Sequence, residues 1–338
     1  MLERPEIADG ALAACLRRDY GIEAGSIEFL PLGYDFSAAV YRVTDRDRRA
    51  YFLKVRFAPL NPLSVSVPRM LNAAGVPEAV APLPTITGRR WGEVERHAAL
   101  LYPFIEGEGH YSMTLTPALW RDFGGILRRI HAAPIDGDIA DTLPRETFTP
   151  NARYSDAIHH IHALMGDREF DNAYDRQFAD FWLTNQDVIS RVHERAKAIG
   201  RMLEARRPTF VLCHADIHKG NLLREPNGRL HVVDWDQPIL APKERDFVFI
   251  LDGDPDSPTV EDTLFMEGYG AAEIDRLALA YYRYEWAMQD IGSFGETILL
   301  TDAVGDETKR GSMHWFTLMF EPGERIDAAD RLARSLSF

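Results

Sequence analysis

The sequence predicts an α+β fold with two lobes, a small N-terminal lobe built on antiparallel strands and a larger, mainly helical C-terminal lobe. Three observations lead to this prediction. Alternating strand patterns fill much of residues 26–56, helical periodicity dominates from residue 116 onward, and 338 residues are enough to bury more than one core. We place the lobe boundary so that residues 1–103 form the first lobe and residues 104–338 the second.

The N-terminal lobe is expected to begin with a peripheral helix over residues 7–19, where apolar residues recur at helical spacing before Gly21. Short runs of alternating apolar residues then predict five strands. They cover residues 26–32, 38–44, 50–56, 80–84 and 97–102. Between the third and fourth strands a helix is expected before Gly75, and Pro68 would kink it.

The C-terminal lobe begins with a clear helix start, because Thr116 can cap a helix whose first residue is Pro117. This helix is expected to run to His131. Further amphipathic stretches cover residues 152–165, 178–199, 271–289 and 327–336. Two short apolar strands, 210–212 and 230–233, flank a turn at Pro226-Asn227-Gly228.

Composition restricts the class of protein. The chain is 46% hydrophobic, no apolar stretch approaches the length of a membrane span, and the first residues lack a signal-peptide core. We therefore expect a soluble, cytoplasmic protein. Cys15 and Cys213 lie in apolar surroundings far apart in the sequence, which favours buried thiols in a reducing compartment.

The net charge of −14 is unevenly distributed. Residues 1–100 carry 13 Lys and Arg against 12 Asp and Glu, whereas residues 101–338 carry 25 against 40. Such an acidic lobe repels nucleic acid and can attract a small cationic substrate, although solubility alone would also explain the charge. We expect neither a nucleic-acid partner, nor a membrane partner, nor an obligate protein partner.

Two polar clusters at strand ends carry the chemistry. The first is His214-Ala-Asp216, followed by Asn221, and the second is Asp234-Trp-Asp236. Phosphoryl transfer needs a carboxylate near the attacking hydroxyl, and an Asn and an Asp to hold the metal ions that bridge the nucleotide phosphates. Two other interpretations stay open: a zinc site using His214 and His218, and acids that are merely solvated.

These clusters resemble the catalytic loop and metal-binding segment of the aminoglycoside phosphotransferases, antibiotic kinases built on the protein-kinase fold. The resemblance implies a protein-kinase-like two-lobe fold with ATP and Mg²⁺ as cofactors. Asp216 would be the catalytic residue, and Asn221 and Asp234 would bind the metal. The nucleotide would be bound by Lys54 on the third strand, by Asp35 and Ser37 in a loop with only one glycine, and by backbone at Pro103 and Ile105 in the hinge.

The resemblance extends to other positions with less specific roles. Asp236, Glu285 and Asp290 are candidate ligands of a cationic acceptor. His214, His218, Arg245 and Asp246 are expected to support the site structurally, and His214 would brace its loop by a hydrogen bond to backbone near Asp234. Similarity over residues 234–246 favours an aminocyclitol acceptor of the spectinomycin type, so the chain would confer antibiotic resistance.

One departure from the family pattern concerns the lysine. The helix after the third strand normally supplies a Glu that orients Lys54, yet residues 57–72 contain no acid. Another carboxylate, such as Asp234, could orient Lys54, or activity could be reduced. Two alternatives to the antibiotic kinase therefore stay open: a small-metabolite kinase for choline, homoserine or a sugar, and a nucleotide-binding pseudokinase.

Overall fold

The computed structural model describes residues 4–31, 38–109, 113–135, 137–165, 170, 172–301 and 304–336. The chain divides into two compact units. The first comprises Met1–Pro144, Leu212–Ile239 and Leu264–Gly270, and the second comprises Arg145–Val211, Leu240–Thr263 and Ala271–Phe338. These units differ from the lobes predicted on either side of residue 103, and that division stays a prediction.

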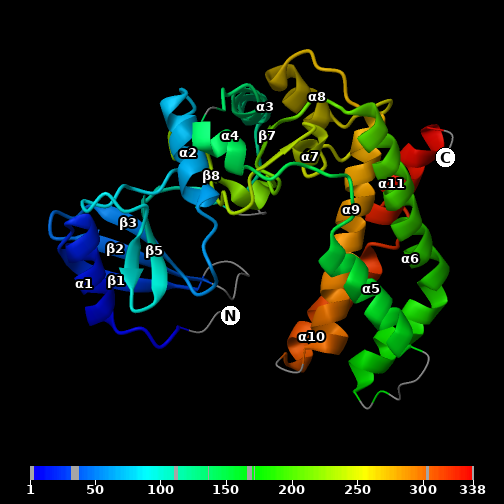
Figure 1. Ribbon diagram of the computed structural model, residues 1–338, viewed down its shortest axis with the longest axis horizontal. Helices are drawn as coiled ribbons and strands as arrows, with labels where there is room; N and C mark the ends of the chain where they lie inside the picture. Colours follow the sequence, from blue (N-terminus) through cyan, green and yellow to red (C-terminus); the bar gives the residue numbers. More distant parts are fainter. Residues whose placement is uncertain are drawn as a thin grey trace. The chain divides into compact units, whose positions relative to one another are not determined.

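The first unit contains a five-stranded antiparallel sheet with the order β1-β2-β3-β5-β4 (Figure 1). Its strands are β1 (Ala24–Leu30), β2 (Ala38–Asp45), β3 (Ala50–Arg56), β4 (Gly92–Val94) and β5 (His97–Pro103). The predicted strands at 26–32, 38–44, 50–56 and 97–102 are thus confirmed to within a few residues. The α1 helix (Asp9–Tyr20), which was also predicted, contacts β1 and β4.

The alternation of β3 sends its side chains to two different environments. Leu53 and Val55 are fully buried in a core that also contains Leu12 and Leu16 of α1. Successive side chains of a strand point to opposite faces of the sheet, so Lys54 lies on the other face. The burial of the first face therefore fixes the direction in which the lysine points.

The predicted strand at residues 80–84 is wrong, because this segment is extended chain outside the sheet. Pro82 and Pro84 have no N–H group and cannot donate to a ladder of backbone hydrogen bonds, which disfavours a strand with two prolines so close together. Single bonds hold the segment instead, from Val80 N–H to the Val232 carbonyl and from Leu83 N–H to the Leu101 carbonyl.

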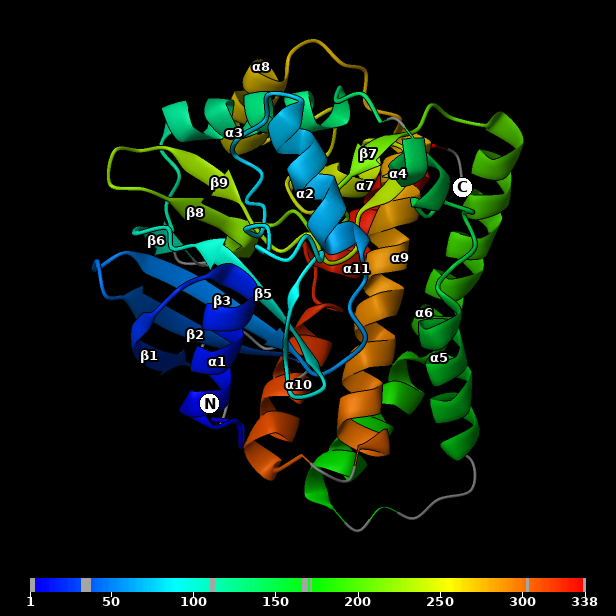
Figure 2. The same ribbon diagram turned by 60° about the vertical axis from the view of Figure 1, so that its left-hand side comes forward.

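The first unit also contains a smaller sheet of three strands, ordered β6-β8-β9 (Figure 2). Pro68 lies inside α2 (Leu63–Ala73), and α3 (Pro117–His131) is capped by Thr116, whose side chain accepts the Leu119 N–H as predicted. The other elements are β6 (Glu108–Gly109), α4 (Gly137–Thr142), β7 (Val211–Cys213), η1 (Lys219–Asn221), β8 (Leu222–Arg224), β9 (Leu230–Val232) and α8 (Val260–Tyr269).

The second unit is mainly helical. Its longest helices, α6 (Ala173–Arg206) and α9 (Arg276–Gly295), contact each other, and α5 (Ala152–Leu164) and α11 (Arg325–Ser335) contact α9 (Figure 1). Its core contains Trp182, Phe178 and Phe316, together with the buried tyrosines 281, 282 and 284. The remaining elements are β10 (Ile239–Ala241), α7 (Glu244–Phe247), η2 (Glu296–Leu300) and α10 (Asp306–Leu318).

The helices expected in the C-terminal part are found, but with different ends. The α6 helix begins five residues before the predicted start at 178, because the Asn172 side chain caps it by accepting the Tyr174 N–H. The α9 helix begins after Asp275, which accepts two N–H groups of its first turn. Within the residues that the structure describes, no helix is long and apolar enough to cross a membrane.

Candidate nucleotide-binding and catalytic site

The centre of the candidate site is an ion pair between Lys54 and Asp234. The Lys54 Nζ lies 2.9 Å from Asp234 Oδ1, although the two residues are 180 positions apart in the sequence. Only 13% of the Lys54 side chain is exposed, against 43% of Asp234. The structure therefore places the largely buried Lys54 amine beside the Asp234 carboxylate, which solvent can still reach. A charged ligand could approach the pair from this exposed side.

The loop between β7 and β8 carries Asp216 and Asn221. The Asn221 Nδ2 donates a hydrogen bond of 2.8 Å to the Asp216 carbonyl and lies 3.3 Å from Asp216 Oδ2. Asn221 is buried, whereas the Asp216 side chain is 54% exposed. Because the amide nitrogen of Asn221 is used as a donor toward Asp216, its Oδ1 is the atom suited to bind a metal ion.

His214 joins the Asp216 loop to the segment that carries Asp234. Its Nε2 lies 2.9 Å from the Val233 carbonyl, and its Nδ1 accepts the Asp216 N–H at 3.3 Å. This pattern requires the proton on Nε2. The brace predicted from the sequence is therefore present, and zinc binding by His214 is disfavoured because both ring nitrogens have partners.

The backbone at Asp234 is in the left-handed region, with φ of +66°, as is Ala215 with φ of +71°. Such conformations are costly for residues other than glycine and often occur at functional sites. Burial tends to raise the pKa of Asp234, but the charge and hydrogen bond of Lys54 outweigh it and lower that pKa below its ordinary value. Asp234 is thus ionised at neutral pH.

Asp236 takes part in the same network. Its Oδ2 lies 3.2 Å from Lys54 Nζ and 3.0 Å from Arg56 Nη1. Asn61 donates to the Asp236 carbonyl at 3.1 Å. The sequence analysis missed Arg56 and Asn61. The signal for Arg56 was its spacing of two from Lys54, which places both side chains on the same face of β3.

His218 lies beside Asp216 in the same loop. Its Nδ1 accepts the Gly220 N–H at 3.0 Å, and its Nε2 is 3.7 Å from Asp216 Oδ1. Burial lowers the pKa of His218 below its usual value, although the nearby Asp216 charge opposes this. The ring is therefore neutral at pH 7, with its proton on the nitrogen that faces the carboxylate.

The remaining predicted nucleotide ligands are less completely defined. Asp35 and Ser37 lie outside the described residues. Pro103 is the last residue of β5 and pairs with Tyr51 in the ladder, and Ile105 follows two residues later. The Phe104 N–H between them donates to the Ala50 carbonyl, so this amide is already used by the sheet.

The predicted acceptor ligands of the second unit lie on α9. Glu285 accepts the Asn151 N–H at 3.0 Å, and burial raises its pKa above the ordinary value although Arg245 opposes this. Asp290 forms an ion pair with Arg325. The Arg325 guanidinium also lies 3.7 Å from the centre of the Trp286 ring, so Asp290 is already neutralised by a cation of its own chain.

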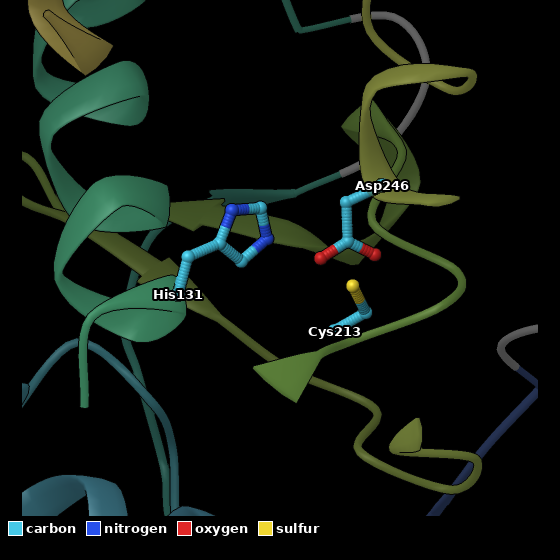
Figure 3. A group of neighbouring side chains, drawn as sticks. All are labelled: His131, Cys213 and Asp246. Atoms are coloured by element: carbon cyan, nitrogen blue, oxygen red, sulfur yellow. The ribbon is translucent and has the colours of Figure 1, made fainter. Parts of the chain in front are cut away.

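The expected structural pair Arg245–Asp246 lies in α7. Asp246 is fully buried, and its side chain is drawn in Figure 3. The same view shows two buried side chains of the first unit, His131 at the end of α3 and Cys213 in β7. His131 Nδ1 lies 2.9 Å from the Tyr269 hydroxyl. Both cysteines are buried and neither forms a disulfide bond, as predicted.

The second unit also has a separate surface depression of about 500 Å³. It is lined by Arg145, Glu146, Thr147, Phe148, Glu204, Arg207, Pro208 and Phe210. None of the candidate site residues named from the sequence is among them.

Comparison with known proteins agrees with this geometry. The model of the phosphotransferase enzyme family matches residues 27–282, which include Lys54, Asp216, Asn221 and Asp234. The chain belongs to this family. It is therefore an enzyme of the kinase type, and the protein-kinase-like fold expected from the sequence is confirmed.

Solved structures of other kinases are similar to this phosphotransferase over nearly its whole length. Spectinomycin phosphotransferase APH(9)-Ia, in complex with ADP and spectinomycin, is 27% identical, with a TM-score of 0.85. The match covers 98% of this chain and 100% of that chain. An aminoglycoside phosphotransferase from Alicyclobacillus acidocaldarius is 13% identical, with a TM-score of 0.64 and coverage of 99% and 98%. The choline kinase LicA from Streptococcus pneumoniae is 14% identical, with a TM-score of 0.56 and coverage of 92% and 97%. The last two show the fold alone.

Proposed function

We propose that this phosphotransferase moves the γ-phosphoryl group of ATP, with Mg²⁺, to a hydroxyl of a small cationic aminocyclitol or aminoglycoside of the spectinomycin type. The observation that carries the proposal is the Lys54–Asp234 ion pair, because it joins β3 to the segment braced against the Asp216 loop. A cation for the phosphates and carboxylates for the metal and the acceptor are the groups that this reaction needs in one place.

In this proposal each residue of the site has a separate role. Asp216 accepts the proton of the acceptor hydroxyl or orients it, and the Asn221 amide holds the Asp216 carboxylate in position. Lys54 binds the nucleotide phosphates. Asn221 Oδ1 and Asp234 hold Mg²⁺, which when bound neutralises charge on the phosphates. Positioning and charge neutralisation contribute more than proton transfer, because the transition state is loose.

The adenine and the rest of the triphosphate are assigned by position in the chain. The backbone at Pro103 and Ile105, directly after β5, is proposed to pair with the adenine edge. Asp35 and Ser37 are proposed to lie near the phosphates. These assignments follow the order of motifs in the family. Side-chain substitutions can test Asp35 and Ser37, but not the backbone contacts at Pro103 and Ile105.

Three observations support a cationic acceptor. Residues 101–338 carry 40 acids against 25 bases, and a carboxylate lies partly buried at Glu285. The similar enzyme APH(9)-Ia was solved with spectinomycin. We propose Glu285 as the ligand of an acceptor ammonium group, and Asp290 as a second ligand once Arg325 is displaced. Because ATP is the donor, we propose that the enzyme acts in the cytoplasm and confers resistance there.

The proposal is tested by measuring ATP consumption with a panel of acceptors: spectinomycin, aminoglycosides, choline and homoserine. Turnover with spectinomycin and not with choline or homoserine is the expected result. Turnover with choline or homoserine alone would identify a small-metabolite kinase. No turnover with any acceptor, despite MgATP binding, would revive the pseudokinase alternative. In a sensitive host, expression of the wild-type chain, but not of Asp216→Asn, should raise the inhibitory concentration of the antibiotic.

A further inference from the structure

The lysine of this enzyme lacks the partner that its helix would normally provide. The α2 helix has the sequence Leu-Ser-Val-Ser-Val-Pro-Arg-Met-Leu-Asn-Ala and carries no acid. The next acid along the chain is Glu78, whose carboxylate lies 2.9 Å from Arg129 Nη2 of α3. Glu78 thus already has a cationic partner, and Lys54 must be held in place by another group.

Asp234 has a second proposed task, because its carboxylate would also hold Mg²⁺. An oxygen that binds Mg²⁺ would be a weaker partner for the Lys54 ammonium group, since the metal would attract its charge. A second carboxylate is needed to hold Lys54 Nζ while Asp234 is engaged. Asp236 Oδ2, at 3.2 Å from Lys54 Nζ, is such a group.

Asp236 is itself fixed from two sides. Arg56 Nη1 donates to its Oδ2 at 3.0 Å, and only 13% of the Arg56 side chain is exposed. Asn61 donates to the Asp236 carbonyl, and its Oδ1 accepts the Leu63 N–H at the start of α2. The Asn61 side chain thus connects the start of α2 to the backbone of Asp236, although α2 contributes no carboxylate.

The charges of the network balance. Lys54 and Arg56 supply two positive charges on one face of β3, and Asp234 and Asp236 supply two negative charges. Lys54 and Arg56 both lie within ion-pair distance of Asp236 Oδ2. Without Asp236, these two cations would lose the carboxylate that they share, and their mutual repulsion would move the lysine away from its position.

We propose that Asp236 is a positioning residue that replaces the missing helix glutamate by holding Lys54 Nζ toward the nucleotide phosphates, and that Arg56 holds Asp236. This role takes the place of the acceptor contact expected for Asp236 from the sequence. The inference rests on the proposed function for its catalytic consequence, but the contact between Asp236 and Lys54 can be tested separately.

The first test uses the protein without nucleotide. Lys54 is labelled with an amine-acylating reagent, and its rate is measured by mass spectrometry against the exposed Lys197 as an internal reference. Asp236→Asn should increase the labelling rate of Lys54 about fivefold, which corresponds to the loss of an ion pair worth about 1 kcal/mol. Asp236→Glu should restore most of the protection. Equal rates in wild type and Asp236→Asn would overturn the proposal.

The second test separates a positioning role from acceptor binding. Asp236→Asn should lower kcat/KM for ATP by about 10–100-fold, with the acceptor KM unchanged, and Asp236→Glu should recover part of it. Glu267→Gln, which removes an exposed partner of Arg121, is the matched control and should change neither value. A raised acceptor KM with normal ATP parameters would show instead that Asp236 binds the acceptor.

Both outcomes can be distinguished from a failure of the proposed function. If the wild type transfers no phosphoryl group, the labelling of Lys54 still reports whether Asp236 holds it. If Asp236→Asn does not fold, as judged by circular dichroism, Arg56→Gln provides a second route, because it removes the other partner of Asp236. Arg56→Gln should also increase the labelling rate of Lys54, but by less than Asp236→Asn does. An unchanged labelling rate in Arg56→Gln would contradict the proposal that Arg56 holds Asp236.

Discussion

Asp216 is the residue whose substitution should affect turnover most specifically. Its side chain is more than half exposed, and two of its partners, Asn221 and His218, belong to the same loop, so we expect its removal to leave the Lys54–Asp234 pair intact. We expect Asp216→Ala to lower kcat by about 10²–10⁴-fold while the affinity for ATP is largely kept. Steady-state kinetics with nucleotide titration calorimetry measure both. Loss of ATP binding at normal turnover of bound substrate would contradict the catalytic role.

Glu285 should make stability depend on pH in a defined direction. Because burial raises the pKa of Glu285 in the folded protein, the folded state favours the protonated carboxyl more than the unfolded state does. The stability that protonated Glu285 contributes to the folded state is fully present below the pKa of Glu285 in the unfolded chain, about 4.5. It is lost as pH rises through the higher pKa of Glu285 in the folded protein. Ionised Glu285 is therefore a destabilising group at neutral pH.

We accordingly expect Glu285→Gln to raise the Tm at pH 7.5 and to leave it nearly unchanged at pH 4, because the amide oxygen can still accept the Asn151 N–H. Thermal unfolding followed by circular dichroism at several pH values measures the difference. Glu194→Gln, at an exposed position paired with Lys197, is the control and should show no such trend. If Glu285 binds the acceptor ammonium, the same variant should also have a raised acceptor KM.

At the level of elements, α3 and α8 approach each other through glycines. A Cβ atom on Gly124 would lie 2.1 Å from the Phe265 carbonyl oxygen, and one on Gly268 would lie 1.9 Å from the Arg121 carbonyl oxygen. Backbone atoms of packed helices cannot yield as a flexible side chain can. By contrast, a Cβ on the neighbouring Gly125 would meet nothing closer than 3.8 Å.

Gly124→Ala should therefore destabilise the protein by about 1–3 kcal/mol, as overpacking in a core typically does. Gly125→Ala, in the same helix, should be neutral or stabilising by up to about 1 kcal/mol because alanine favours the helix. Urea unfolding of the two variants measures the contrast. Similar losses of stability in both variants would show that the α3–α8 contact is looser than the structure indicates.

Helices and strands could be predicted where residues such as caps and prolines mark their ends in the sequence. The α3 helix was predicted with nearly correct ends because Thr116 and Pro117 mark its start. The strand at 80–84 was predicted from its apolar residues alone, and two prolines prevented its pairing. The α10 helix was missed because Gly311 lies inside it and Gly305, which precedes it, provides no side-chain cap to mark its start.

At the level of the whole molecule, the kinase-like fold could be predicted because Lys54, the segment from His214 to Asn221, and Asp234 follow one another in the order typical of that fold. The partner of Lys54 could not be fixed in advance. Asp236 lies 182 positions away from it, and no local pattern decides which of two neighbouring acids a distant amine will contact. Contacts between such distant residues depend on tertiary packing, whereas the order of the motifs can be read directly from the sequence.

The uneven charge of the molecule leads to the last prediction, which applies if the acceptor is cationic. Residues 101–338 carry 15 more acids than bases, and such a field raises the encounter rate of a cation. Salt should weaken this attraction, because the Debye length falls from about 30 Å at 0.01 M to about 8 Å at 0.15 M ionic strength.

We therefore expect kcat/KM for a cationic aminocyclitol to fall several-fold between about 10 mM and 150 mM NaCl, most of it through a rising KM. MgATP carries net negative charge, so its kcat/KM should stay level or rise over the same range, and it serves as an internal control for inactivation by salt. A neutral acceptor analogue should show little change. If both substrates lost efficiency together, salt would be acting on the enzyme as a whole, and the acidic surface would then serve solubility rather than acceptor capture.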